Sequence, residues 1–365
     1  MAGKKKKQTG KKIPWWAVLL VLAAVFAVQY LGGKTEEQPA PTAQVQETPS
    51  GETLTVRFLD VGQGDSILLS CGDETMLIDG GPVEEGQFLV SRLNRLDVTG
   101  LTYVVNTHPD EDHCGGLAAV LAKYPAGHVY SSVAAYTTKV FSNVVKYTEE
   151  QGRQIEVPET GTHWGLGSAT VTVIGPVQEY SDPNNGSLVL RVDYGETSFL
   201  FTGDMEQKAE GDLLESGADV RADVLKAGHH GSPTSSSEAF LTAVQPSVAI
   251  ISVGADNDYG HPTEATLNRL SACGIPVYRT DLLGEIIAVS DGKTVTMTTA
   301  SNETPSADAA SQPTGSYGYV GNSSSKVVHL AGCGKLPGES NRVYFASLDE
   351  ALAAGYRKHA NCLGN

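Results

Sequence analysis

The stretch that most constrains this chain is NTHPDEDHCGG, residues 106–116, where imidazoles and carboxylates crowd together directly after an apolar run. His108, Asp110, Asp112 and His113 are all side chains that coordinate divalent metals in proteins. Carboxylates placed this closely repel one another unless a cation offsets their charge. A helix N-terminus would favour the acids through its dipole, but it would not account for the two histidines. We therefore expect a metal site where a strand ends.

Charge is distributed unevenly along the 365 residues. The net charge is -16, yet residues 1–34 carry seven lysines and no acid, which leaves 19 of the 26 basic residues against all 42 acidic ones. So acidic a body excludes broad binding to a phosphate backbone, although a local metal-centred site can still accept a phosphodiester. The five cysteines are too few and too scattered for a disulfide-stapled scaffold.

The N-terminal segment predicts that the protein is attached to a membrane. A basic tail, residues 1–12, precedes an uncharged and mostly apolar run over residues 13–33, and about 20 apolar residues span a bilayer as a helix. Lysines before the run and acids after it predict a cytoplasmic N-terminus. We expect an uncleaved, single-pass anchor in the cell membrane, a polar tether over residues 34–52, and an extracytoplasmic body.

From residue 53 the pattern changes to short strand-like runs interspersed with helical segments, in two similar halves. This order predicts a layered α/β sandwich over residues 53–300, followed by a low-complexity linker at 301–318 and a small module at 319–365. Further polar clusters adjoin the predicted strands, and strand-end loops are where such folds build ligand sites. These clusters supply Asn184, Asn185, Ser187, Asp204, His229, His230 and His261.

Taken in order, FLDVGQGDSILL, LIDGG, THPDEDHCGG, LFTGDME, KAGHHGS and YGHP resemble the motifs of the metallo-β-lactamase superfamily. HPDEDH is similar to the superfamily's His-x-His-x-Asp-His, with Asp110 replacing the second histidine. All six motifs together resemble the hydrolase domain of ComEC-type competence DNA-uptake proteins. The resemblance implies a four-layer αββα sandwich, of the α/β (α+β) class, with a site for two metal ions.

In such a site two divalent ions, Zn²⁺ or Mn²⁺, activate water together. His108 and Asp110 are expected at the first ion, Asp112 and His113 at the second, and Asp204 between them. Either member of the pair His229 and His230 can complete the coordination of the second ion; we assign His229 as the ligand. The oxygen ligand Asp110 favours Mn²⁺ more than an all-imidazole site would.

Catalytic roles are expected for Asp112, His230 and His261. His261, or the member of the 229–230 pair that is not a ligand, would protonate the leaving oxygen, while a capping or phosphate-contacting role for His261 stays open. Residues expected to support the ligands or contact substrate are Asp60, Asp79, Asn185, Ser187, Lys226 and Tyr259.

One departure from the superfamily lies between the first motif and Asp204. Its usual histidine is absent, and NNGSLVL stands in the corresponding stretch. This leaves one metal site poor in ligands, so we expect full occupancy only with a substrate phosphate present. We also expect poor β-lactamase activity.

The C-terminal module holds His329-x3-Cys333 and His359-x2-Cys362. This spacing predicts a four-ligand structural Zn²⁺ site. The module resembles the small metal-binding domain of Ada-type DNA repair proteins, which uses four cysteines. The alternative is that His329 is incidental and the cysteines are free or joined in a disulfide.

Together these features predict a membrane-anchored, extracytoplasmic, metal-dependent hydrolase of phosphodiesters with DNA as its substrate. Two alternatives stay open: a phosphoesterase acting on phosphocholine or a cell-wall polymer, and a non-catalytic DNA-binding surface protein. No protein partner can be deduced from the sequence.

Overall fold

The computed structural model describes residues 51–299, 319–322, 325–330, 335, 342–345 and 348–363. The basic tail, the predicted span at 13–33, the linker at 301–318 and Cys333 lie outside the described residues. Among the helices of the described ranges, none combines the length and the apolar character needed to cross a bilayer.

Eight strands form the first sheet, in the order β15-β14-β1-β2-β3-β4-β5-β6. Strands β3, β4 and β5 run parallel, whereas β1 pairs antiparallel with β2 and β14. The strands are β1 (Leu54–Phe58), β2 (Ile67–Cys71), β3 (Glu74–Ile78), β4 (Leu101–Asn106), β5 (Ala126–Ser131), β6 (Ile155–Glu156), β14 (Ile286–Ser290) and β15 (Val295–Thr299).

The second sheet has seven strands in the order β13-β12-β11-β10-β9-β8-β7. Strands β10 to β13 are parallel, and every residue of β12 is buried, as expected for a strand covered on both faces. The strands are β7 (His163–Leu166), β8 (Ala169–Gly175), β9 (Val189–Tyr194), β10 (Thr197–Phe201), β11 (Val224–Lys226), β12 (Val248–Ile251) and β13 (Val277–Arg279).

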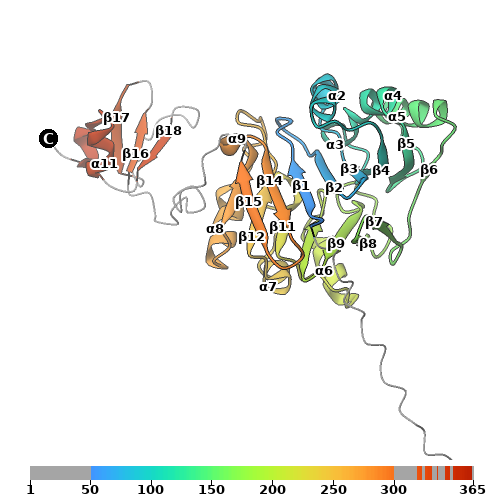
Figure 1. Cartoon of the computed structure of the whole chain (residues 1–365). Helices are drawn as coiled ribbons and strands as arrows, with labels where there is room; N and C mark the ends of the chain where they lie inside the picture. The colour runs from blue at the N-terminus through green and yellow to red at the C-terminus, as the bar shows by residue number, and fades with distance from the viewer. Residues whose placement is uncertain are drawn as a thin grey trace, which may run out of the picture. The chain divides into compact units, whose positions relative to one another are not determined.

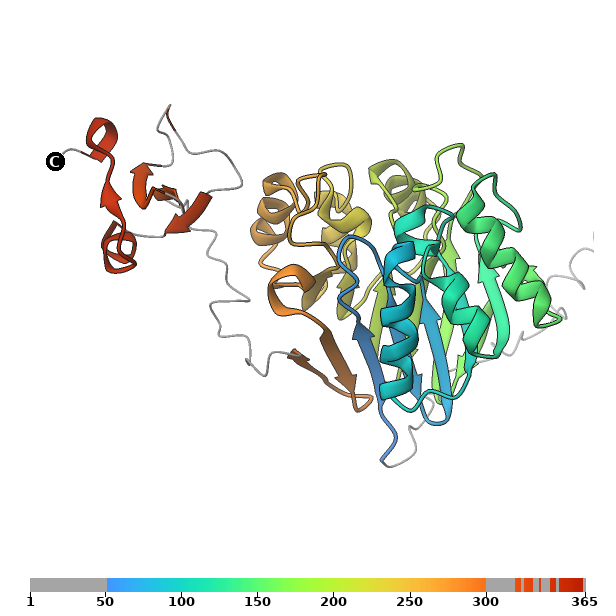
Figure 2. The same cartoon turned by 90° about the horizontal axis from the view of Figure 1, so that it is seen from above.

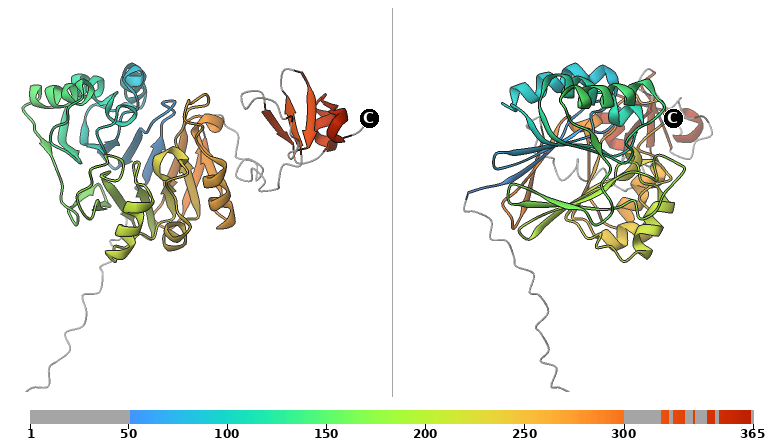
Figure 3. Two further views of the ribbon diagram at one scale, coloured as in Figure 1. Left: turned by 180° about the vertical axis from the view of Figure 1, so that it is seen from behind. Right: turned by 90° about the vertical axis from the view of Figure 1, so that its right-hand side faces the viewer.

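The two sheets pack face to face, and helices cover the outer face of each (Figures 1 and 2). One apolar core lies between the sheets, and two more lie under the helix layers. The right-hand view of Figure 3 shows helices on both outer sides of the strands. The predicted layered α/β fold is confirmed. The helices are η1 (Val83–Glu85), α2 (Gly86–Arg95), α3 (Glu111–Cys114), α4 (Leu117–Lys123), α5 (Lys139–Glu150), α6 (Gln207–Glu215), η2 (Gly228–Gly231), α7 (Glu238–Val244), α8 (Glu264–Ala272) and α9 (Thr280–Leu283).

The parallel pairing of strands in both sheets determines at which edge the loops that follow them lie. Strands β3 and β4 run parallel in one sheet, and β10, β11 and β12 run parallel in the other. Parallel strands bring their carboxyl ends to one edge, where α/β folds bind ligands. The loops after β4, β10 and β11 carry the polar motifs of the sequence.

The C-terminal module forms its own four-stranded sheet, in the order β18-β16-β17-β19. Val328, Ala351 and Tyr356 are its buried apolar residues within the described ranges. Its elements are β16 (Tyr319–Asn322), β17 (Val327–Leu330), β18 (Arg342–Phe345), α11 (Leu348–Ala353), β19 (Arg357–Lys358) and α12 (Ala360–Leu363).

Candidate metal centre

Three strand-end loops bring five predicted side chains into one cluster: His108, Asp112, His113, Asp204 and His230. His113 Nε2 lies 3.2 Å from Asp204 Oδ1 and 3.2 Å from His230 Nε2. His230 Nε2 lies 3.2 Å from Asp112 Oδ2 and 3.5 Å from Asp204 Oδ2. Three loops that are far apart in the chain therefore point their nitrogen and oxygen atoms at one small volume.

The donor atoms of this cluster suit divalent cations. They form two sets of three, His108–His113–Asp204 and Asp112–His113–His230, each with donor atoms within 4.8 Å of one another. The Nε2 atom of His108 is buried and has no hydrogen-bond partner among the described residues. An orphaned polar atom in the interior is costly, and a coordinated ion would satisfy it.

The carboxylates of the cluster favour positive charge at two of its three histidines. Burial lowers the pKa of His108 to about 3. Burial opposes protonation of His113 and His230 too, but Asp204 and the neighbouring carboxylates outweigh it and raise both histidine pKa values. Conversely, His230 and His113 outweigh burial and hold the pKa of Asp204 well below its ordinary value. The buried carboxylates thus favour positive charge at His113 and His230, as they would favour a divalent cation.

The structure reverses the roles assigned to His229 and His230. Both have left-handed backbone conformations, with φ of 50° and 51°, and their rings are 6.3 Å apart at an angle of 74°. His230 is buried beside Asp112 and His113, whereas the side chain of His229 is 23% exposed and its Nε2 lies 3.8 Å from Asp204. His230 therefore lies within the cluster of candidate ligands, and His229 lies at the rim. Strand periodicity cannot predict which residue of a left-handed turn faces inward.

Asp110 lies on the open side of the cluster. Its Oδ2 is 3.8 Å from His108 Nε2, and its side chain is 42% exposed. Ser187 accepts a hydrogen bond from the Asp204 amide at 3.1 Å, so it holds the loop that carries Asp204. Asn185 donates to Glu206 and accepts from the Ala209 amide, so it too supports a loop.

Asp79 lies where support of a ligand was predicted. It is fully buried and accepts hydrogen bonds from the amide and hydroxyl of Thr107 at 2.7 and 2.6 Å. A further contact joins its Oδ2 to His113 Nδ1 at 2.9 Å. A carboxylate at Nδ1 fixes the ring so that Nε2 faces the cluster.

Asp65, rather than Asp60, provides the second buried carboxylate behind the cluster, which corrects the prediction. Asp60 is exposed, and its hydrogen bond within residues 51–299 comes from the Gly62 amide. Asp65 lies 2.8 Å from Lys226 Nζ and 3.4 Å from His230 Nδ1. Burial raises the pKa of Asp65, but Lys226 and His230 outweigh it and bring the pKa below its ordinary value. Lys226 is fully buried, so its role is structural and not in substrate contact.

A signal for this pair was available in the sequence. Asp65 directly precedes the apolar run SILL, and Lys226 ends the apolar strand VLK. Buried charges of this kind need a partner of opposite sign, so the acid just before one core strand could have been matched with the base that ends another.

Comparison with known proteins is consistent with this geometry. The model of the metallo-beta-lactamase superfamily matches residues 59–255, which is more than half of the chain and includes the whole cluster. The chain belongs to the metallo-beta-lactamase superfamily. Membership implies a metal-dependent hydrolase in general terms.

Curated relatives of this superfamily member include competence proteins. "Competence protein ComA" of Neisseria gonorrhoeae is 35% identical over 274 residues, covering 74% of this chain and 35% of that protein. "ComE operon protein 3" of Bacillus subtilis is 32% identical over 252 residues, covering 63% and 32%. These relatives confirm the predicted ComEC-type resemblance, and the chain spans about a third of their length. Among solved structures, the metallo-beta-lactamase fold protein YhfI of Bacillus subtilis has a TM-score of 0.44 at 11% identity, covering 67% of this chain and 100% of that one.

The rim of the metallo-beta-lactamase centre carries two further predicted residues. The His261 ring stands edge-on to His229 at 5.5 Å, and the Tyr259 ring stacks on His261 at 5.8 Å. Burial and the nearby His229 lower the pKa of His261 to about 4. Tyr259 is 69% exposed. His261 therefore connects the exposed ring of Tyr259 with His229 at the rim.

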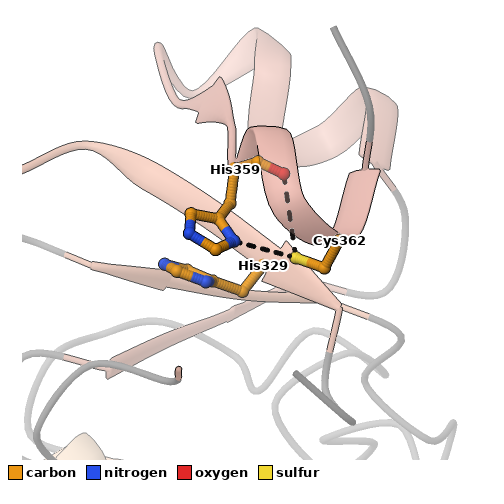
Figure 4. A group of neighbouring side chains, drawn as sticks. All are labelled: His329, His359 and Cys362. Atoms are coloured by element: carbon orange, nitrogen blue, oxygen red, sulfur yellow. Dashed lines mark hydrogen bonds between the residues drawn. The ribbon is translucent and has the colours of Figure 1, made fainter. Parts of the chain in front are cut away.

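Three of the four predicted zinc ligands of the C-terminal module lie together: His329, His359 and Cys362 (Figure 4). The two imidazole rings are 4.0 Å apart, and His359 Nδ1 lies 3.2 Å from Cys362 Sγ. The Nδ1 atom of His329 is buried without a hydrogen-bond partner among the described residues. These donor types fit Zn²⁺; the fourth, Cys333, is outside the described residues.

Proposed function

We propose that this metallo-beta-lactamase superfamily protein hydrolyses phosphodiesters, with DNA as its substrate. The observation that carries the proposal is the cluster of His108, Asp112, His113, Asp204 and His230, which offers two overlapping sets of metal ligands. The names of two relatives, a competence protein and "Recombination protein 2" of Haemophilus influenzae, support nucleic acid as the substrate.

The chemistry that paired divalent ions supply in such a site is activation of water and polarisation of a phosphoryl oxygen. Asp204 belongs to one ligand set and contacts the other, so its carboxylate is suited to lie between two ions. Asp110, with its side chain 42% exposed and 3.8 Å from His108, marks the side of the cluster from which we propose that a phosphate oxygen approaches. Asp110 adds oxygen to this side and favours Mn²⁺, while Zn²⁺ suits the imidazoles.

In this proposal, an imidazole at the rim of the cluster protonates the leaving oxygen. His229 and His261 are neighbouring imidazoles at the rim, with ring centroids 5.5 Å apart, and Glu206 contacts His229 Nδ1 at 3.2 Å. The Nε2 atom of His229 is then directed toward the centre, 3.8 Å from Asp204. An imidazole so placed can deliver a proton to the departing oxygen.

The test is metal content and turnover of the purified full-length protein with Mn²⁺ or Zn²⁺. Substrates are single-stranded DNA and bis-p-nitrophenyl phosphate. Asp112→Ala and Asp204→Ala should lose metal and activity on both, whereas Asp73→Ala, an exposed acid in the turn between β2 and β3, is the matched control.

The outcomes separate the rival functions. Hydrolysis of the small ester with intact DNA would favour a different phosphoester, such as phosphocholine or a cell-wall polymer. A hydrolase domain that takes up no metal would favour the non-catalytic DNA-binding protein. Full metal and full turnover in both variants would refute the assignment of the centre.

We also propose that the C-terminal module holds a structural Zn²⁺ through His329, Cys333, His359 and Cys362. So small a core gains much of its folding free energy from a metal. Cys362→Ser should remove one zinc per chain, whereas Cys273→Ser, at an exposed cysteine of the hydrolase domain, should remove none. Equal zinc in both variants would contradict the site.

For the whole chain we propose anchoring in the cell membrane by residues 13–33, with the body outside the cytoplasm. Protease added to intact cells should then digest the body, and the protein should stay in the membrane fraction after alkaline washing. Full protection from protease, or release by the wash, would contradict this placement.

A further inference from the structure

Tyr259 is unusual on the surface of the hydrolase domain. Five large apolar or aromatic side chains of the described residues are markedly exposed, and Tyr259 is the one aromatic among them and the most exposed, at 69%. It lies between β12 and α8, on the loop that reaches the rim of the metal centre. An exposed aromatic ring beside a reaction centre can contact substrate.

The loop that presents Tyr259 is held in place by its own side chains. Asn257 Nδ2 donates to the carbonyl oxygens of Gly254 and His261 at 2.8 and 2.7 Å, and Asn257 Oδ1 accepts from the His261 amide at 2.9 Å. Pro262 packs so closely on Gly231 that a Cβ there would meet the Pro262 Cβ at 2.6 Å. The exposure of Tyr259 therefore belongs to an ordered loop, and binding there needs little further ordering.

A row of rings leads from Tyr259 to the centre. Tyr259 stacks on His261, with centroids 5.8 Å apart and planes inclined by 23°. His261 meets His229 edge-on at 5.5 Å, and His229 Nε2 is 3.8 Å from Asp204. The row of rings thus places the exposed Tyr259 on the same rim as His229, whose imidazole lies beside Asp204.

We propose that Tyr259 is a stacking platform for the nucleobase next to the scissile phosphate, so that the enzyme takes an unpaired, single-stranded nucleotide unit. This inference rests on the proposed phosphodiesterase function. A third planar ring extends a nearly parallel stack, since aromatic rings prefer offset stacking. The face of a base is open to such stacking only when the base is out of the stack of a duplex, as it is in a single strand.

Negative charge on the loop of Tyr259 limits the length of nucleic-acid strand that can bind there. Asp256 and Asp258 are exposed next to Tyr259, and acids repel a phosphate backbone. Binding of a single base and one phosphate avoids this repulsion, whereas binding of a long strand along this loop would not. A quaternary ammonium group would suit the acids, but it is bound best between aromatic faces set at an angle, and the rings of Tyr259 and His261 are nearly parallel.

The test compares two phosphodiesters with the same leaving group, using the full-length protein and Mn²⁺. One is the p-nitrophenyl ester of thymidine 5′-phosphate, which carries a base, and the other is methyl p-nitrophenyl phosphate, which does not. We expect Tyr259→Ala to lower the selectivity, the ratio of the two kcat/KM values, by about tenfold. Tyr259→Phe should preserve the ratio, because the phenyl ring still stacks. Thermal unfolding of each variant checks that the fold is intact.

Each outcome decides between the two proposals. If neither ester is hydrolysed, the proposed function fails and this inference fails with it. If both are hydrolysed with the same ratio in wild type and Tyr259→Ala, phosphodiesterase activity stands and the platform is refuted. If Tyr259→Ala instead impairs hydrolysis of p-nitrophenylphosphorylcholine and leaves the thymidine selectivity unchanged, the ring recognises a quaternary ammonium group, which also overturns the inference.

Discussion

Each imidazole of the metal centre is held at the ring nitrogen that faces away from the cluster. His113 Nδ1 contacts Asp79, His230 Nδ1 contacts the carbonyl oxygen of Ser252 at 2.9 Å, and His108 Nδ1 contacts the Thr107 hydroxyl at 3.1 Å. Such partners set the tautomer and leave Nε2 directed into the cluster, where it could bind a metal ion. At the residue scale, the site depends as much on these partners as on the ligands.

Asp79→Asn tests this dependence. Asp79 has a φ of 57°, a conformation that Asn also tolerates, so the backbone should be retained. Loss of the carboxylate behind His113 should weaken metal binding about 10–100-fold. Metal titration with a competing chelator measures the change. An unaltered affinity would show that Asp79 does not control the ring.

Separate substitution of the two adjacent histidines tests the corrected assignment. His230→Asn should lose metal from the Asp112–His113 side together with activity. His229→Asn should keep its metal but slow turnover by about 10²–10⁴-fold, because a rim proton donor is removed. Metal analysis alongside kcat distinguishes the variants. Metal loss in His229→Asn with full metal in His230→Asn would make His229 the ligand after all.

At the scale of elements, two strand-end loops are joined behind the ligands by a buried ion pair. Lys226 ends β11, and Asp65 lies on the loop between β1 and β2. Gly64 precedes Asp65 with a φ of 134°, and a Cβ there would collide with the Asp112 carbonyl oxygen. The Asp65 amide also donates to that oxygen at 3.1 Å. The loop between β1 and β2 is thus packed directly on α3 and holds this helix in position.

Lys226→Met should lower the free energy of unfolding by about 3–5 kcal/mol, because it leaves the buried Asp65 without a counter-charge. Chemical denaturation measures the loss. The double variant Asp65→Asn/Lys226→Met should recover much of it, and Lys208→Met, which removes a charge from a surface ion pair, is the control. A loss in Lys226→Met no larger than in Lys208→Met would show that the pair is not needed for stability.

At the scale of the whole molecule, metal and pH should act on stability together. The pKa values of His113 and His230 are raised in the metal-free fold. Groups with raised pKa stabilise the fold fully below the unfolded pKa, about 6.5. That contribution is lost as pH rises through their folded pKa values, so the metal-free protein should become less stable above about pH 6.5.

Metal should reverse this trend. Binding needs deprotonated imidazoles, so affinity, and the stabilisation it brings, should increase as pH rises. The difference in Tm between metal-loaded and metal-free protein should therefore grow between about pH 6 and pH 8. Thermal unfolding with excess Mn²⁺ or with chelator measures it at each pH. A constant or shrinking difference would contradict a centre built on these histidines.

The sequence by itself determined the layered α/β architecture and the place of the site. Short strand-like runs with helical segments between them indicate the layers, and polar residues crowded after strands indicate the edge where a ligand binds. Local pattern suffices here, because it reflects which residues must be buried and where each strand ends. The motifs and the family that they resemble predicted His108, Asp112, His113 and Asp204 as metal ligands, and the fold brings these side chains together.

Tertiary structure decided which of His229 and His230 faces inward, and that Asp65 rather than Asp60 lies behind the ligands. Both choices depend on backbone torsions in loops and on contacts between residues more than 150 positions apart. No local pattern encodes such contacts, because histidine and aspartate occur both buried and exposed. The stacking of Tyr259 on His261 also depends on tertiary structure. The two rings lie against each other in a loop that is held by the hydrogen bond from the His261 amide to Asn257.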